Sequence, residues 1–247
     1  IMLDYPEKRK HHIGRTYLLI GLIYYFKIQD QQNSLINLEQ SLGYLEDNDK
    51  PNYCLTLSIL SILYCAQGRF TEALKTVNSS LHLRKAIFGN DHLDIAASYN
   101  IKGSILRVQR KYDEALNAYI KSENILYKIE KQKINNLQTN NNEDDPLEIA
   151  LQRFSSKFVP DLCNTYLFMS EMYGRLGQME EALLYLHKTF ESIKNFDSGL
   201  GIDKKMFEFC SQKAKRLSQG IPSLHQKILK LIDFHLGKSD TNPLFIV

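Results

Sequence analysis

The sequence lacks features that several classes of protein require. Tryptophan is absent, and glycine and proline number only 12 and 6 in 247 residues, which disfavours a turn-rich β-sandwich and suits long helices. The longest apolar run near the start, residues 17–26, is interrupted by Gly21 and is too short to span a bilayer. The N-terminus also lacks the cleavage pattern of a signal peptide. We therefore expect a folded, helical chain without a transmembrane segment.

Strong charge and clustered cysteines are missing too. The net charge of +3 is too small to predict a nucleic-acid binder by itself. Cys54, Cys65, Cys163 and Cys210 lie far apart and form no C-x-x-C pair. We expect free, mostly buried thiols in a reducing compartment, and hence a cytoplasmic chain.

The common signatures of catalysis and metal binding are likewise not found. The motifs HExxH, GxSxG, GxxxxGK[ST] and GxGxxG do not occur. His11 and His12 are adjacent, so on a helix they point in different directions. His187, His225 and His235 are singletons on predicted helices. The sequence therefore predicts no catalytic residue, no metal site and no cofactor.

What the sequence does contain is a repeat. Residues 68–74, 110–116 and 177–183 read GRFTEAL, RKYDEAL and GQMEEAL. Ala73 and Ala115 are 42 positions apart, and Ala115 and Ala182 are 67 apart, which is 42 plus 25. A repeat of 42 residues, with one insertion of 25 residues, fits both spacings. The sequence is therefore predicted to be built from repeats.

Each copy of the pattern has a local physical meaning. The alanine lets two helices approach closely, and the bulky residue three positions earlier packs into a hairpin. Apolar residues recur at helical spacing upstream of each copy, for example Leu57, Leu60 and Tyr64. Each unit is therefore predicted to be a helix, a turn and a second helix, and neighbouring hairpins must stack to bury their faces.

These units resemble the tetratricopeptide repeat, in the 42-residue form found in kinesin light chains. The best match is residues 80–100, SLHLRKAIFGNDHLDIAASYN. Gly89 suits a helix C-cap, Asp91 or Asp94 can cap the next helix, and His92 is expected to be a hydrogen-bonding turn residue. The resemblance implies an all-α, right-handed superhelical solenoid of stacked hairpins. It also implies a binding scaffold, with association with the cytoskeleton left open.

The chain is predicted to be a single domain of such hairpins. Residues 14–46 form a degenerate repeat, and residues 52–88, 92–130 and 159–195 form regular ones. Residues 131–158 are a polar insertion, expected to be a disordered loop up to Pro146, followed by an extension of the next helix. Residues 203–238 form a terminal helical pair, suited to a capping role because it diverges from the repeat.

That terminal pair is also strongly basic. Residues 204–238 hold eight Lys or Arg against two acids, a local charge of +6. A solvated outer face is the simplest interpretation, and contact with an acidic partner, RNA or a membrane surface is the alternative. The candidate basic surface consists of Lys204, Lys205, Lys213, Lys215 and Arg216.

The resemblance also implies where a peptide would bind. In such a stack the first helix of each unit lines the concave groove. Asn100 matches an asparagine that related repeats use to hydrogen-bond a peptide backbone, and Arg107, further along the same helix, could bind a carboxylate. Ser58 and Ile62 stand where the clamp for chaperone C-termini has polar or cationic groups, which disfavours that ligand. The full set is Ser58, Ile62, Cys65, Asn100, Ser104, Arg107, Asn164, Leu167, Glu171 and Arg175.

Three functions remain open from the sequence. The first is a non-catalytic adaptor or scaffold that binds a protein or peptide partner, alone or inside a larger cytoskeletal or transport assembly. The second is a regulatory or sensor module of a longer protein. The third is RNA or membrane-surface binding through the basic terminal helices, which the modest net charge disfavours.

Overall fold

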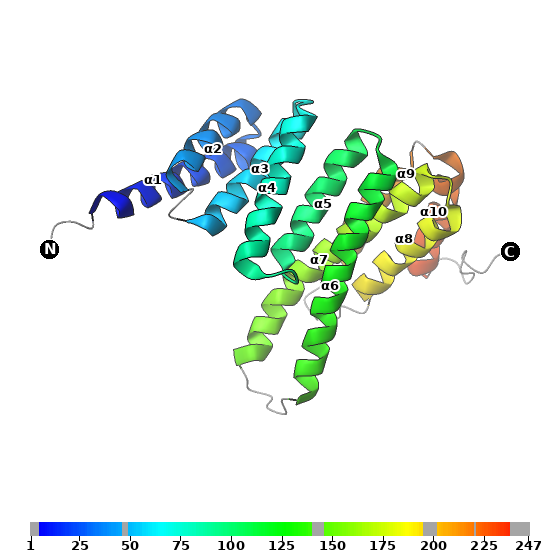
Figure 1. The fold of residues 1–247 in the computed structure, drawn as a ribbon. Coiled ribbons are helices and arrows are strands. Elements are labelled where there is room, and N and C mark those ends of the chain that lie inside the picture. The colour runs from blue at the N-terminus through cyan, green and yellow to red at the C-terminus, as the bar shows by residue number, and fades with distance from the viewer. Residues whose placement is uncertain (1–4, 46–48, 140–145, 195–201, 220, 238–247) are drawn as a thin grey trace. The chain divides into compact units, whose positions relative to one another are not determined.

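The computed structural model describes residues 5–45, 49–139, 146–194, 202–219 and 221–237. All regular structure in these ranges is helical, as predicted (Figure 1). The chain divides into two compact units, Ile1–Gln109 and Arg110–Val247, and each is described separately. The division falls within the third predicted repeat, so a single-domain organisation stays a prediction.

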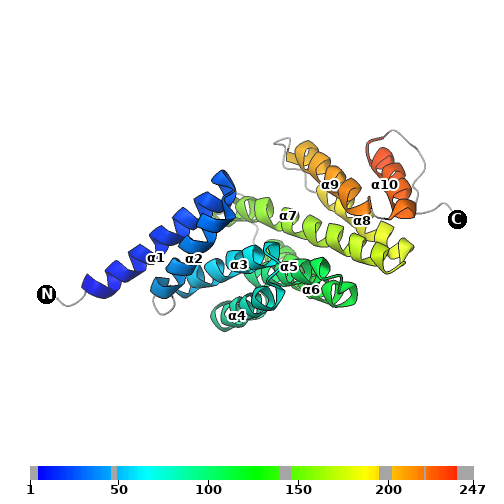
Figure 2. The same ribbon diagram turned by 90° about the horizontal axis from the view of Figure 1, so that it is seen from above.

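The first unit is a series of helices joined by short turns. In chain order it holds α1 (Tyr5–Ile23), a π-helical turn (Tyr24–Ile28), α2 (Gln31–Leu45), α3 (Lys50–Ala66), α4 (Phe70–Phe88) and α5 (Leu93–Val108). Helices α1 and α2 run side by side, and so do α3 and α4 (Figure 2). Helix α3 also packs against α2 and α5, which makes α3 and α5 neighbours.

Small residues bring the paired helices of this unit close together. Ala73 is fully buried, as the repeat pattern predicts. A Cβ atom on Gly21 of α1 would lie 2.7 Å from Leu38 Cγ of α2. Ser34 of α2 donates a hydrogen bond of 2.9 Å to the carbonyl oxygen of Gly21, and Ser80 of α4 donates one of 2.9 Å to the carbonyl of Cys54. Buried hydroxyls are therefore satisfied by the backbone of the facing helix.

The start of α3 is held by a buried carboxylate. Asp49 caps the helix by accepting from the backbone N–H of Asn52 at 3.3 Å. Its Oδ2 also accepts from Arg15 Nε at 2.7 Å and lies 2.9 Å from His11 Nε2. Burial alone raises the pKa of Asp49, but the hydrogen bonds from Asn52 and Arg15 outweigh it and leave that pKa below its usual value. Asp49 thus ties α1 to the first turn of α3.

The turn between α4 and α5 follows the best-matching segment of the repeat. Gly89 ends α4 with a positive φ of 78° that favours glycine, but its ψ of −168° lies outside the left-handed helical region expected for this cap. The cap of α5, however, is neither aspartate: His92 Nδ1 accepts from the backbone N–H of Asp94 at 3.2 Å. The imidazole takes this role while it stacks on Phe88, with ring centroids 4.3 Å apart. His92 is thus a hydrogen-bonding turn residue, as expected.

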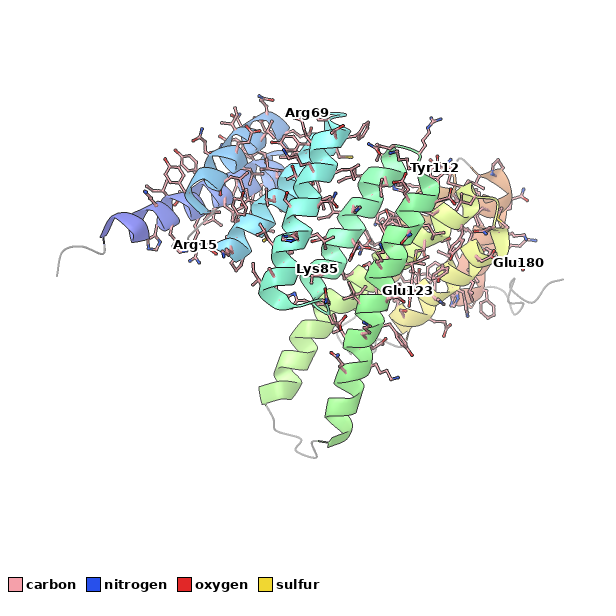
Figure 3. All side chains as sticks on the ribbon, viewed as in Figure 1. Arg15, Arg69, Lys85, Tyr112, Glu123 and Glu180 are labelled. Atoms are coloured by element: carbon pink, nitrogen blue, oxygen red, sulfur yellow. The ribbon has the colours of Figure 1, made fainter. Side chains whose placement is uncertain are left out.

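One buried and one exposed arginine contact neighbouring helices of the first unit. Arg84 of α4 is only 6% exposed and donates to the carbonyl of Asp94 at 2.9 Å and to Ser98 Oγ at 2.6 Å, both in α5. At the opposite end of α4, Arg69 lies 4.3 Å from the ring centroid of Tyr64 (Figure 3). The hydroxyl of Tyr64 in turn donates to Glu39 of α2 at 2.9 Å.

The second unit contains longer helices. It holds α6 (Tyr112–Thr139), α7 (Pro146–Arg175), α8 (Met179–Lys194), α9 (Ile202–Ser218) and α10 (Pro222–His235). Helix α6 continues to Thr139, through residues that the sequence assigned to a disordered loop. Ile134 and Leu137 fall at helical spacing there, which suits a continued helix. Helix α7 includes the predicted extension over residues 147–158, and residues 140–145 lie outside the described part of the chain.

An aromatic cluster joins the first three helices of this unit. Tyr119 of α6 stacks on Phe168 of α7, with centroids 5.3 Å apart. Glu123 of α6 accepts from the Tyr185 hydroxyl at 3.3 Å and lies 3.6 Å from Lys188 Nζ, both on α8 (Figure 3). Burial first, and then the Glu123 charge, raise the pKa of Tyr185, so it stays a neutral donor.

The terminal pair α9 and α10 packs on α7 and α8. A Cβ on Gly174 of α7 would lie 2.6 Å from Leu224 Cδ2 of α10, so a glycine is needed at this contact. Leu224, Ile228 and Leu231 of α10 are buried and belong to the core of the second unit. Helices α9 and α10 therefore cover apolar surface of α7 and α8 that would otherwise be exposed to solvent.

Candidate functional site

The candidate groove residues of the first unit lie on the neighbouring helices α3 and α5. Ile62 and Cys65 of α3 are half-buried, and so are Asn100, Ser104 and Arg107 of α5. Burial raises the pKa of the Cys65 thiol, and the positive charge of the Arg107 guanidinium opposes that rise. We call these five residues the α3–α5 face.

Ser58 does not belong to this face, which corrects the sequence prediction. Its side chain is 3% exposed and lies inside the α3–α4 hairpin. Its hydroxyl donates to the carbonyl of Cys54 at 3.0 Å and lies 3.1 Å from Ser80 Oγ. This side of α3 therefore faces α4 inside the hairpin and not an open groove.

The predicted groove positions of α7 are largely covered by the terminal helices. Leu167 is 1% exposed and lies with Ala214 of α9 and Leu224 and Ile228 of α10 around a small internal cavity, which corrects its assignment to a groove. Glu171 borders the same cavity and is 5% exposed. It lies 3.7 Å from the guanidinium of Arg175, an exposed residue one helical turn further on.

Asn164, the remaining groove position of α7, is already engaged. Lys213 of α9 donates a short hydrogen bond to Asn164 Oδ1, and its ammonium lies 4.3 Å from the ring centroid of Phe168. Lys213 was assigned from the sequence to a basic surface, but the structure places its charge against α7. Helix α9 therefore occupies the side of α7 where the sequence predicted a groove.

The rest of the candidate basic surface is only partly described. Lys215 and Arg216 are exposed near the end of α9. Lys204 and Lys205 fall in the first turn of α9, and their side chains lie outside the described part of the structure.

Three of the four cysteines are buried, and Cys65 is half-buried, as expected. The interaction of the Cys163 thiol, as donor, with the Cys210 sulfur raises the pKa of Cys163, and burial raises it further. In the described residues, no helix has both the length and the apolar character needed to cross a bilayer.

The comparison with known proteins identifies the repeats. Residues 53–128 match the family model of the tetratricopeptide repeat. No curated protein matches the chain by sequence. Among solved structures, kinesin light chain TPR-like repeats from Podosopora anserina match with a TM-score of 0.53 at 15% identity, over 96% of this chain and 98% of that one. BtubC (BKLC) from P. vanneervenii matches with a TM-score of 0.58 at 13% identity, over 95% and 91%.

The segment 53–128 therefore carries tetratricopeptide repeats, and the fold of the chain is like that of kinesin light chain repeats. At these identities the two structures establish a shared fold and nothing more. The predicted all-α tandem-repeat fold is thereby confirmed. Tetratricopeptide repeats are generally non-catalytic modules that bind peptides or proteins.

Proposed function

We propose that this protein is a non-catalytic scaffold or adaptor that binds an extended segment of a partner protein on the α3–α5 face. The observation that carries the proposal is the grouping of a half-buried amide, a guanidinium and an apolar side chain on two neighbouring helices. Asn100 supplies the amide, Arg107 the guanidinium and Ile62 the apolar contact. The family-model match over residues 53–128 includes all of these residues.

Each group on this face can make a specific contact with a bound peptide. The amide of Asn100 offers a donor and an acceptor, so it can pair with a peptide bond whatever side chain the peptide carries. The guanidinium of Arg107 can form two parallel hydrogen bonds with a carboxylate. Ile62 and Cys65 add apolar area that rewards a hydrophobic side chain. A short acidic segment with one apolar anchor is therefore the ligand that this face fits.

The corresponding positions of α7 support a restricted binding surface. Asn164 is engaged by Lys213, and Leu167 is covered by α9 and α10. Peptide binding on α7 at these positions would require α9 to leave. The five residues of the α3–α5 face are half-buried, whereas Leu167 and Glu171 of α7 are almost fully buried, so the α3–α5 face is the more exposed of the two.

Affinity measurements on a selected peptide test this proposal. Peptides from a displayed random library are selected on the full chain, and their dissociation constants are compared among the wild type, Asn100→Ala and Arg107→Ala. Loss of one or two hydrogen bonds predicts a weakening of about 10-fold for each variant. The matched control is Lys75→Ala, an exposed change on α4.

The same measurement distinguishes the alternative surface. Peptides or RNA that bind through the terminal helices should lose affinity in the double variant Lys215→Glu, Arg216→Glu and retain it in Asn100→Ala. That pattern would reject the α3–α5 face. Folding of every variant is checked by circular dichroism, so that loss of binding is not confused with loss of structure.

A further inference from the structure

Two histidines that are 48 positions apart in the sequence meet in the second unit. His187 Nδ1 of α8 lies 3.0 Å from His235 Nε2 of α10. Glu191 follows His187 by four positions, so both lie on the same face of α8. Glu191 Oε1 lies 3.8 Å from His235 Nδ1. One ligand atom from each of the three residues lies within 4.8 Å of the other two.

The cluster combines a buried imidazole, His235, with a more exposed carboxylate, Glu191. The His235 side chain is only 5% exposed, and its ring packs against Phe190 with centroids 5.1 Å apart. The Glu191 side chain is 39% exposed, so its carboxylate can change rotamer at little cost. His187 is half-buried. Rigid imidazoles with one mobile carboxylate at the solvent edge leave an entry path for an ion.

The distances are close to those that a coordinated ion requires. Zinc binds imidazole nitrogen at about 2.0–2.1 Å in tetrahedral geometry, which places two ligand nitrogens roughly 3.3 Å apart. The two imidazole nitrogens at 3.0 Å would have to separate by only a few tenths of an ångström. The carboxylate would have to move further, and its exposure permits that. Two imidazoles and one carboxylate are ligands that suit zinc and the other late divalent metals.

We propose that His187, Glu191 and His235 form a binding site for a divalent transition metal, for which Zn²⁺ is the natural probe. Three protein ligands leave a fourth position for water. The bound ion would link α8 to the last turn of α10 and so hold the terminal pair on the repeat. His187 and Glu191 show the helical i, i+4 spacing in the sequence, but the third ligand is supplied only by the fold.

The experiment is a calorimetric titration of Zn²⁺ into the full chain after treatment with a chelator and dialysis. One ion should bind per chain, with at least 10-fold weaker affinity in His187→Gln and in Glu191→Gln. His82→Gln, which removes an exposed histidine of α4, is the matched control and should bind as the wild type does. Because Glu191 is exposed, its variant remains informative if the histidine variant fails to fold.

Thermal unfolding provides a second readout of the same site. A saturating concentration of Zn²⁺ should raise the midpoint of the wild type and of His82→Gln, because an ion that binds only the folded state stabilises it. The midpoint of Glu191→Gln should rise much less. If the wild type binds no Zn²⁺, or if both cluster variants bind it as the wild type does, the proposal is overturned. In the first case the histidines only share a hydrogen bond, and in the second the ion is bound by surface groups such as His12.

Discussion

Lys213 of α9 donates a hydrogen bond to Asn164 of α7, at a position where the repeat pattern predicts a peptide-binding asparagine. The same ammonium lies over the ring of Phe168, one turn further along α7. Lys213 of α9 thus occupies the position beside Asn164 where a bound peptide was expected. This contact engages one residue of the predicted groove and ties α9 to α7 within the second unit.

The contact can be measured by a double-mutant cycle. Lys213→Met and Asn164→Ala should each destabilise the chain, and their combination should cost less than the sum by about 1 kcal/mol, because the hydrogen bond can be lost only once. The free energy of unfolding is obtained from urea titrations. Additive effects within about 0.3 kcal/mol would show that the two residues do not interact in solution.

Asp49 should make the stability of the chain sensitive to acid. Its folded-state pKa is lowered because the hydrogen bonds from Asn52 and Arg15 outweigh the effect of burial. The unfolded chain therefore binds the proton more readily, and the contribution of Asp49 is lost as the pH falls below about 4. Asp49→Asn should cost about 1–2 kcal/mol at pH 7, and this cost should shrink between pH 5 and pH 3. A cost that does not change with pH, measured alongside the exposed-site control Asp233→Asn, would contradict this role.

Gly21 and Gly43 provide a matched pair of substitutions in α1 and α2. Alanine in a helix normally stabilises by about 0.5–1 kcal/mol relative to glycine, and Gly43→Ala should show this gain because nothing lies within 4 Å of its added Cβ. Gly21→Ala should instead destabilise the chain, since its Cβ would meet Leu38 at 2.7 Å. Urea midpoints compare the two variants, and a gain in both would mean that α1 and α2 can separate without cost.

Arg84 should be among the most sensitive positions of the first unit. Arg84→Ala removes two hydrogen bonds to α5 and leaves the carbonyl of Asp94 without this donor, for an expected cost of about 2–3 kcal/mol. Arg84→Lys should retain part of this stability, because the ammonium keeps the charge but loses the planar fork. A loss below about 0.5 kcal/mol in the alanine variant would show that the buried guanidinium contributes little.

The repeat pattern predicted the fold well because its alanines mark the positions where two helices pack closely. Ala73, Ala115 and Ala182 are all fully buried, since each alanine marks the close approach of two helices. The boundaries of α9 and α10 also follow from Pro222 and from helical periodicity. The long continuation of α6 was missed because its polar composition outweighed the weaker spacing of Ile134 and Leu137.

The candidate site was less predictable because it depends on which helix covers which face. Leu167 and Ser58 have the positions of groove residues in the repeat, but both are covered. Leu167 lies against α9 and α10, and Ser58 lies against α4. The meeting of His187 with His235 has no local signal at all, because the two residues come together only when α10 packs on α8. Tertiary packing, which one sequence does not specify directly, decided these cases.

Peptide binding on the α3–α5 face is tested most directly by nuclear magnetic resonance of the full chain with a selected peptide. Amide chemical shifts are recorded as the peptide is added. We predict that the largest changes cluster at Ile62, Cys65, Asn100, Ser104 and Arg107, and that they disappear in Asn100→Ala, Arg107→Ala. Changes centred instead on Lys215 and Arg216, with the α3–α5 face unaffected, would contradict the proposed binding surface.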